Sequence, residues 1–250
     1  ATACLAQQSV AQADDIPTIE SDTLLIGSDM TYPPYIYLEG ENPTGFEVDF
    51  MNAVAEHMGL EAEYVDTRFA QLIVGLRSNR YDVIASLLYI TPERAEVIDY
   101  VPHTQTGSSI LTASNYADSP SKPNDLCGMR VSSIQGASWV PKLTEVSDQH
   151  CIPNGLGEID IREFATAPEA TQAILAGAVE AQFADAAVAK LAMENTDDAL
   201  KITSKELIYP IPVGLGVSSS NPEIKNAIAA AIEKMKESGQ YEEILSAYNL

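Results

Sequence analysis

Short apolar runs alternate with segments of helical spacing along the first part of the chain. Residues 23–28 and 61–66 each have the pattern of a β-strand, whereas the apolar residues between Phe50 and Met58 recur at the spacing of one helix face. Gly59 follows that helix and suits its end, because glycine readily takes the left-handed conformation of a helix C-cap. This alternation is typical of α/β folds.

The same alternation continues to the C-terminus. Further strands are predicted over residues 81–88, 130–134, 179–184 and 211–218. Further helices are predicted around residues 72–76, from Thr91-Pro92-Glu93, after Gly136-Ala137-Ser138, over residues 168–176 and from Asn221-Pro222 onward. A stretch rich in Ser, Pro and Asn, residues 114–124, separates the first set of units from the second.

This order predicts two lobes, with the chain returning to the first lobe at its end. We expect residues 22–106 and 212–250 to form lobe 1 and residues 107–211 to form lobe 2, with crossovers near residues 106–109 and 209–212. Ligands of open α/β sheets bind at the carboxyl ends of the strands. The residues at those ends are therefore the candidates for function.

Charge narrows the range of partners. The 250 residues include 14 Lys and Arg but 36 Asp and Glu, which gives a net charge of −22. Such a polyanion repels phosphate backbones and anionic lipid, so nucleic acid and membrane surfaces are not expected partners. The simplest interpretation is that the excess carboxylates keep the protein soluble.

The first residues have the character of a processing segment rather than of the fold. Residues 1–13 end in Ala11-Gln12-Ala13, which fits a signal-peptidase site, while Ala1-Thr2-Ala3-Cys4 resembles a lipobox that would make Cys4 a lipid-modified N-terminus. Both interpretations place the protein outside the cytoplasm, in a periplasm or on a cell surface. No apolar run of membrane-spanning length follows.

The remaining cysteines, Cys127 and Cys151, lie 24 positions apart (151 − 127). In an oxidising compartment they would pair and close a loop worth about 3–4 kcal/mol; the alternative is two buried free thiols. The histidines are scattered at positions 57, 103 and 150. We therefore expect neither a metal site nor a cofactor.

Arg94 is the first candidate for binding chemistry. It lies in the first turn of the helix that Thr91 is expected to cap, where a cation opposes the helix dipole. Such local conflicts tend to mark functional sites, and a bound carboxylate would resolve this one through a bidentate contact with the guanidinium. The alternative is a structural ion pair with Glu93 or Glu96.

Two further candidates follow predicted strands of the second lobe. Ser138 ends a turn of small residues at a helix start, where backbone N–H groups favour an anion, although it could be a plain N-cap. Asp185 follows a buried strand and precedes an alanine-rich helix, so it could cap that helix or receive an ammonium group in a cleft.

Aromatic residues accompany these polar groups. Tyr32, Phe69, Tyr89 and Trp139, the last being the only tryptophan, fall at strand ends or helix starts, where they could line a pocket or simply pack. The sequence contains no Gly-x-Ser-x-Gly, P-loop or Gly-x-Gly-x-x-Gly motif. Local sequence thus supplies no nucleophile–base pair, and we expect a binding protein rather than an enzyme.

Taken together, these segments resemble the extracellular solute-binding proteins of polar amino-acid ABC transporters, over residues 23–250. The segments that carry the resemblance, in family order, are Asp29-Met30-Thr31-Tyr32-Pro33-Pro34-Tyr35, Gly45-Phe46-Glu47-Val48-Asp49-Phe50, Arg80-Tyr81-Asp82-Val83-Ile84-Ala85, Ile90-Thr91-Pro92-Glu93-Arg94-Ala95, Ile134-Gln135-Gly136-Ala137-Ser138 and Phe183-Ala184-Asp185. The resemblance implies the two-lobed type II periplasmic binding protein fold, with a ligand cleft between the lobes and two hinge crossovers.

The resemblance also implies a role for each matching residue. Arg94 and Ser138 would bind a ligand carboxylate and Asp185 its α-amino group. Tyr32 and Phe69 would enclose the ligand side chain, and Asp29 would lie near its far end. Cys127 and Cys151 match a disulfide found in many members, and the implied partner is a membrane permease served by a monomeric binding protein.

The chain departs from the family pattern at Tyr89, where a small hydroxyl residue is common, and at Trp139, where a smaller polar residue is frequent. The function implied is solute binding for an ABC importer, with an amino acid or similar zwitterion as ligand. The two aromatic residues leave open a modified, cyclic or cationic derivative of the ectoine or opine type. A further alternative is an enzyme on the same fold, such as a cyclohexadienyl dehydratase.

Overall fold

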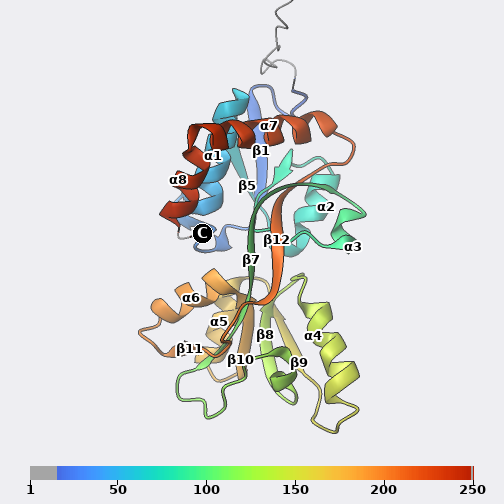
Figure 1. Cartoon of the computed structure of the whole chain (residues 1–250), viewed down its shortest axis with the longest axis vertical. Helices are drawn as coiled ribbons and strands as arrows, with labels where there is room; N and C mark the ends of the chain where they lie inside the picture. Colours follow the sequence, from blue (N-terminus) through green and yellow to red (C-terminus); the bar gives the residue numbers. More distant parts are fainter. Residues whose placement is uncertain (1–15, 249) are drawn as a thin grey trace, which may run out of the picture.

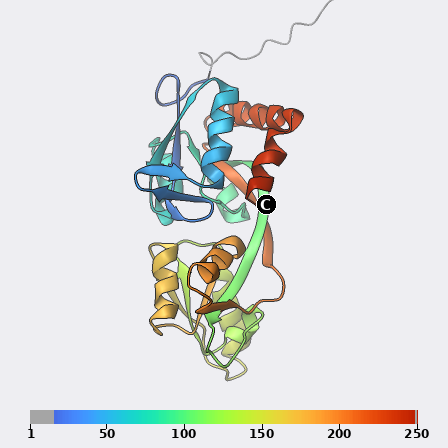
Figure 2. The same cartoon turned by 90° about the vertical axis from the view of Figure 1, so that its left-hand side faces the viewer.

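Two long strands, β7 (Asp99–Ala113) and β12 (Ile208–Val217), run from one α/β lobe of the protein into the other (Figure 1). The computed structural model describes residues 16–248 and 250; the processing segment 1–13, including Cys4, lies outside the described residues. Figure 2 shows the same two lobes stacked along the long axis, with β7 and β12 side by side between them. The predicted lobe limits fall within these two strands and stay a prediction.

Apart from β7 and β12, lobe 1 is built from the first and the last part of the chain. Its elements are β1 (Thr23–Ser28), β2 (Thr31–Tyr32), β3 (Ile36–Glu39), β4 (Asn42–Thr44), α1 (Phe46–Met58), β5 (Glu61–Asp66), α2 (Leu72–Arg77), β6 (Val83–Ile84), α3 (Pro92–Ala95), α7 (Pro222–Ser238) and α8 (Gln240–Ala247). Helices α1, α7 and α8 pack against one another, while α2 packs on β1 and β6.

Lobe 2 is built from the middle of the chain. Its elements are β8 (Arg130–Ile134), α4 (Val140–Val146), β9 (Asp160–Phe164), α5 (Ala167–Leu175), β10 (Ala181–Asp185), α6 (Ala186–Glu194) and β11 (Leu200–Ile202). Among the described residues, none of the helices of either lobe combines the length and apolar character that a bilayer crossing requires.

One mixed sheet passes through both lobes. Its strand order in the described residues is β5-β1-β6-β12-β7-β10-β8-β9, with β11 paired to β7, and a small separate sheet has the order β2-β3-β4. In lobe 1, β5, β1 and β6 are parallel, and in lobe 2, β10, β8 and β9 are parallel. The carboxyl ends of these two parallel groups face the gap between the lobes, which is where the candidate residues lie.

Several predicted elements have the expected bounds. The strands predicted over 23–28, 61–66 and 130–134 are β1, β5 and β8. Gly59 ends α1 in the left-handed conformation, with φ 75°. The helix predicted from Asn221-Pro222 is α7, whose buried residues are Ile224, Ile228, Ala231, Ile232 and Met235.

The strand predicted over 81–88 is shorter than expected. Only Val83–Ile84 pairs as β6. Leu87 takes a left-handed conformation with φ 48°, which turns the chain out of the sheet before Tyr89. The Leu87 amide donates to Oε1 of Glu47, a fully buried carboxylate in the first turn of α1. The turn that presents Tyr89 to the cleft is therefore fixed from within lobe 1.

The two remaining cysteines are joined. Cys127 and Cys151 form a disulfide, with their Cα atoms 5.3 Å apart. The bond connects the segment before β8 to the end of the helical region that follows α4. The pairing expected for an oxidising compartment is thus confirmed, and the alternative of two free thiols is excluded.

Candidate functional site

Most of the candidate residues line a small cavity between the lobes, whereas Asp29, Thr91 and Asp185 are not among its lining residues. This inner cavity has a volume of about 10 Å³, and its lining residues are Tyr32, Phe69, Leu87, Tyr89, Arg94, Ile134, Ala137, Ser138 and Trp139. Six of these were predicted from the sequence. A space of this size holds about one water molecule, so the lobes are closed upon each other.

Arg94 forms the wall of the inner cavity on lobe 1. Thr91 caps α3 as predicted, since its Oγ1 accepts from the Arg94 backbone N–H at 3.3 Å. The guanidinium donates from Nη1 to the Tyr89 carbonyl and from Nη2 to the Gly136 carbonyl, both at 3.0 Å. It also lies 5.4 Å from the centre of the Phe69 ring.

The positive charge of Arg94 has no carboxylate within ion-pair distance among the described residues. The structural alternative, an ion pair with Glu93 or Glu96, is therefore not formed. Burial lowers the pKa of the Arg94 guanidinium, because the charged form loses hydration. A half-buried guanidinium with carbonyl partners only can accept an anionic ligand.

The Gly136 contact brings the two lobes close together. Gly136 has φ 80°, and a Cβ at this position would lie 3.2 Å from the Cα of Ala70 in lobe 1. Only glycine fits both the left-handed backbone and this close approach. The turn that leads to Ser138 is thus held directly beneath Arg94.

Asp185 lies at the end of β10 and is fully buried. Its Oδ1 accepts from the Ala187 N–H at 2.9 Å and from the Tyr35 hydroxyl at 3.0 Å. Its Oδ2 accepts from the Tyr89 hydroxyl at 2.7 Å and from Thr106 Oγ1 at 2.8 Å. The predicted cap of α6 is confirmed, and the same carboxylate meets tyrosines of lobe 1; its role toward an ammonium group stays a prediction.

Burial raises the pKa of the Asp185 carboxyl, because an ionised group loses hydration in the interior. The hydrogen bonds from Tyr89, Thr106, Tyr35 and Ala187 act in the opposite direction and favour the ionised form. Asp185 is consequently a buried acceptor that is stabilised by neutral donors alone. A cationic group would add a charge partner that these donors do not provide.

The two unusual aromatic residues meet across the cleft. The rings of Tyr89 and Trp139 lie edge to face, with centroids 5.6 Å apart, and both residues are only 4% exposed. Trp139 is fixed by its Nε1–H, which donates to Ser133 Oγ at 2.8 Å, and by its contact with Phe183. Tyr89 of lobe 1 thereby inserts into an aromatic and polar pocket of lobe 2.

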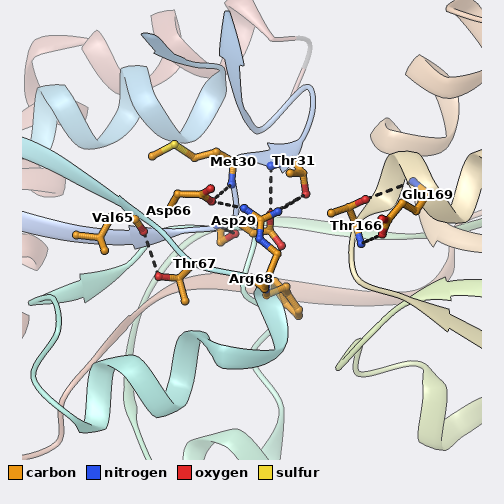
Figure 3. A network of polar contacts seen from close by, with 11 residues as sticks. Asp29, Met30, Thr31, Val65, Asp66, Thr67, Arg68, Thr166 and Glu169 are labelled. Carbon is orange, nitrogen blue, oxygen red and sulfur yellow. Dashed lines mark hydrogen bonds and ion pairs between the residues drawn. The ribbon is translucent and has the colours of Figure 1, made fainter. Parts of the chain in front are cut away.

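Asp29 belongs to a polar network at the edge of the cleft (Figure 3). Its fully buried carboxylate accepts from Thr31 and from the Phe69 N–H, and it forms an ion pair with Arg68 at 2.9 Å. Arg68 also contacts Asp66 and donates to Thr31 Oγ1. In this arrangement Asp29 orients Phe69, and its charge is balanced by Arg68.

A wider groove opens outside Arg94. It has a volume of about 730 Å³ and lies between α3 and α4, with Thr91, Arg94, Ser138, Lys142 and Glu163 among its lining residues. The groove shares Arg94 and Ser138 with the inner cavity, so it leads from solvent to the candidate carboxylate site.

Sequence reasoning missed three side chains at this site: Tyr35, Thr106 and Arg68. Tyr35 and Thr106 donate to Asp185 from 150 and 79 positions away. Tyr35 is part of the Tyr-Pro-Pro-Tyr segment and Thr106 lies in the predicted crossover, so both positions carried a signal. Among the described residues, no cluster of His, Cys, Asp and Glu is arranged to hold a metal ion.

Comparisons with known proteins identify the family of the chain. A family model described as "Bacterial extracellular solute-binding proteins, family 3" matches residues 24–250. The L-cystine-binding protein TcyJ of Escherichia coli (strain K12) is 27% identical over 222 residues, which cover 88% of this chain and 80% of that protein.

Solved structures of the same kind share the fold. An ancestral arginine-binding protein bound to arginine superposes with a TM-score of 0.84 at 28% identity, covering 91% of this chain and 98% of its own. The ancestral amino acid-binding protein AncCDT-1, a precursor of cyclohexadienyl dehydratase, has a TM-score of 0.77 at 26% identity, covering 91% and 95%. The two-lobed fold implied by the sequence resemblance is confirmed.

Proposed function

Since the chain belongs to the family of bacterial extracellular solute-binding proteins, family 3, we propose that it binds an amino acid between its lobes and delivers it to the permease of an ABC importer. The observation that carries this proposal is the pair of buried groups at the cleft. Arg94 is a guanidinium without a carboxylate partner among the described residues, and Asp185 is a carboxylate without a cationic partner there.

The ligand carboxylate binds at the Arg94 end. The guanidinium offers a planar fork of donors that matches a carboxylate. The Thr91 cap fixes the turn of α3 from which Arg94 projects, and Ser138 approaches from lobe 2. The present acceptors of the Arg94 guanidinium, the Tyr89 and Gly136 carbonyls, are neutral. A bound carboxylate compensates the positive charge, which burial has deprived of hydration.

The ligand ammonium binds at the Asp185 end. Tyr89 spans the distance between the two groups, because its carbonyl accepts from Arg94 while its hydroxyl donates to Asp185. The two charged groups therefore contact opposite ends of one residue, and the ligand is expected to present its carboxylate to one and its ammonium group to the other. Tyr32, Phe69 and Trp139 surround the ligand side chain.

A bound ligand keeps the lobes closed about β7 and β12. A zwitterion that contacts Arg94 on lobe 1 and Asp185 on lobe 2 stabilises the closed state over the open state, and only such a differential contact shifts the population. Relatives with related cargo support this function: TcyJ is named for L-cystine, and the ancestral protein was solved with arginine.

The remaining assignments follow from this function. The protein acts outside the cytoplasm as a monomer, after cleavage near Ala13 or after lipid attachment at Cys4. Arg94 and Asp185 are both assigned to binding, so we propose a binding protein and not an enzyme, although AncCDT-1 shows that a neighbour in structure preceded a dehydratase.

A panel of amino acids tests the proposal. We expect L-cystine, L-arginine or another L-amino acid to raise the melting temperature of the wild type, with an affinity that calorimetry then measures. Arg94→Ala should abolish that binding. The control is Arg162→Ala, which removes an exposed arginine that pairs with Asp160 on β9. Unchanged affinity in Arg94→Ala would remove Arg94 from the ligand site.

A further inference from the structure

The acceptor capacity of Asp185 is fully used within the protein. A carboxylate offers about four lone-pair sites for hydrogen bonds. Four donors occupy them, two on each oxygen: the Tyr35 hydroxyl and the Ala187 N–H on Oδ1, and the hydroxyls of Tyr89 and Thr106 on Oδ2. An ammonium group is a donor only, so it cannot reach Asp185 unless one of these donors leaves.

Only one of the four donors borders the inner cavity. Tyr89 lines it, whereas Tyr35, Thr106 and Ala187 are not among its lining residues. The Ala187 N–H belongs to the cap of α6, and Thr106 lies on β7, which continues through both lobes. Tyr89 is therefore the donor that a ligand entering the cavity meets first.

The ring of Tyr89 also accounts for the small size of the cavity. It is 4% exposed and lies against Trp139, with ring centroids 5.6 Å apart. The space left beside the two rings is about 10 Å³, which is enough for about one water molecule. The ligand must thus displace the phenol both from Asp185 and from the volume of the site.

From these contacts we propose that Tyr89 is a specificity-determining residue that competes with the ligand ammonium for Asp185. This inference rests on the amino-acid-binding function proposed above. The Tyr89 hydroxyl donates to Asp185 from lobe 1 and, with that of Tyr35, holds the lobes together. A ligand binds only if its ammonium group forms a stronger contact with Asp185 than the phenol does, so ligands without that group are rejected.

Removal of the hydroxyl alone tests the competition. We expect Tyr89→Phe to bind L-cystine or L-arginine about 10-fold or more tightly than the wild type, because a hydrogen bond to a charged acceptor corresponds to about a 10- to 100-fold change in an equilibrium constant. The matched control is Tyr35→Phe, which removes a phenol from the same carboxylate at a position outside the cavity lining. It should not tighten binding.

Two calorimetric results would overturn the proposal: an affinity of Tyr89→Phe equal to or weaker than that of the wild type, or an equal gain in Tyr35→Phe. Failure of the proposed function can be distinguished from failure of the Tyr89 competition. If Arg94→Ala retains affinity while Tyr89→Phe still gains it, the carboxylate assignment is wrong and the competition stands.

A second measurement needs no ligand. Trp139 is the only tryptophan of the chain and contacts Tyr89, so its fluorescence reports on this contact. Without ligand, we expect weak quenching by acrylamide in the wild type and a red-shifted emission with a higher quenching constant in Tyr89→Phe. The control Tyr64→Phe loses a hydroxyl that bonds Val48 and Asn52 within lobe 1 and should match the wild type. If Tyr89→Phe also matches it, the phenol does not hold the closed state and the proposal fails.

Discussion

Replacement of Asp185 by Asn separates the charge of this residue from its shape. The amide keeps the size of the carboxylate but has one acceptor oxygen and one donor nitrogen. Of the four donors that now reach Asp185, the two on one oxygen would face the amide nitrogen instead. With the amide nitrogen turned toward the Tyr89 and Thr106 hydroxyls, these can accept from it, so the four contacts remain hydrogen bonds but lose their charged acceptor.

The expected magnitudes differ for folding and for binding. For folding, each hydrogen bond to the charged carboxylate, worth about 1.5–3 kcal/mol, is replaced by a neutral hydrogen bond worth about 0.5–1.5 kcal/mol. The neutral amide also removes a buried charge, whose desolvation penalty is several kcal/mol, so the change in folding stability is partly offset. Ligand affinity has no such offset, and loss of one partner of a buried charge pair costs about 2–5 kcal/mol, or about 30- to several-thousand-fold in Kd.

Calorimetry with the amino acid that gives the largest thermal shift measures the ligand affinity. Urea denaturation measures the folding stability. The matched control is Asp82→Asn, because Asp82 is also a buried carboxylate, 6% exposed, whose pKa burial raises and which accepts from Leu25 and Ile19 far from the cleft. We expect Asp185→Asn to lose affinity and Asp82→Asn to lose only stability. If Asp185→Asn binds as tightly as the wild type, Asp185 does not bind the ammonium.

Three further predictions concern the disulfide, the cleft glycine and pH. Replacement of Cys127 and Cys151 by Ser should lower the free energy of unfolding in urea by about 3–4 kcal/mol, from the loop of separation 24 that the bond closes; a loss below about 1 kcal/mol would contradict this loop-entropy reasoning. Gly136→Ala should weaken ligand binding, because its Cβ meets Ala70 across the cleft, whereas Gly177→Ala, with φ 68° and no atom within 4 Å, should change stability only; equal affinities in calorimetry would refute the close-approach argument. Affinity should fall as pH decreases through the raised pKa of Asp185, at a pH above the value of about 3.9 typical of an exposed aspartate, because only the ionised carboxylate attracts an ammonium; a titration flat down to that value would refute it. The folding stability of the ligand-free protein depends on pH in the opposite direction. A raised pKa means that the folded state holds the proton to a higher pH than the unfolded state, so the contribution of Asp185 to stability decreases as pH rises through this window.

The sequence predicted the lobes more completely than the connection between them. Strands β1, β5 and β8 were found because each combines a short apolar run with clear boundaries. Strand β7 was missed as an element, because it leaves one core, passes the gap between the lobes and enters the other core. Its middle residues, 104–106, are partly or fully exposed, so no single period of apolar residues marks the strand.

At the site, local conflicts in the sequence were informative. Arg94 in the first turn of a helix and Asp185 after a buried strand could be singled out from their neighbours alone. The partners of these groups could not, since Tyr35, Thr106 and Tyr89 reach Asp185 from 150, 79 and 96 positions away. The saturation of Asp185 is a property of the closed tertiary structure and has no local signature.

The central claim, that Arg94 recognises a ligand carboxylate, is tested most directly by a cycle of two proteins and two ligands. Calorimetry would compare the amino acid that gives the largest thermal shift with its decarboxylated amine, each against the wild type and Arg94→Ala. We expect the wild type to prefer the amino acid strongly and Arg94→Ala to lose this preference. An Arg94→Ala variant that still prefers the amino acid by the same factor would contradict it.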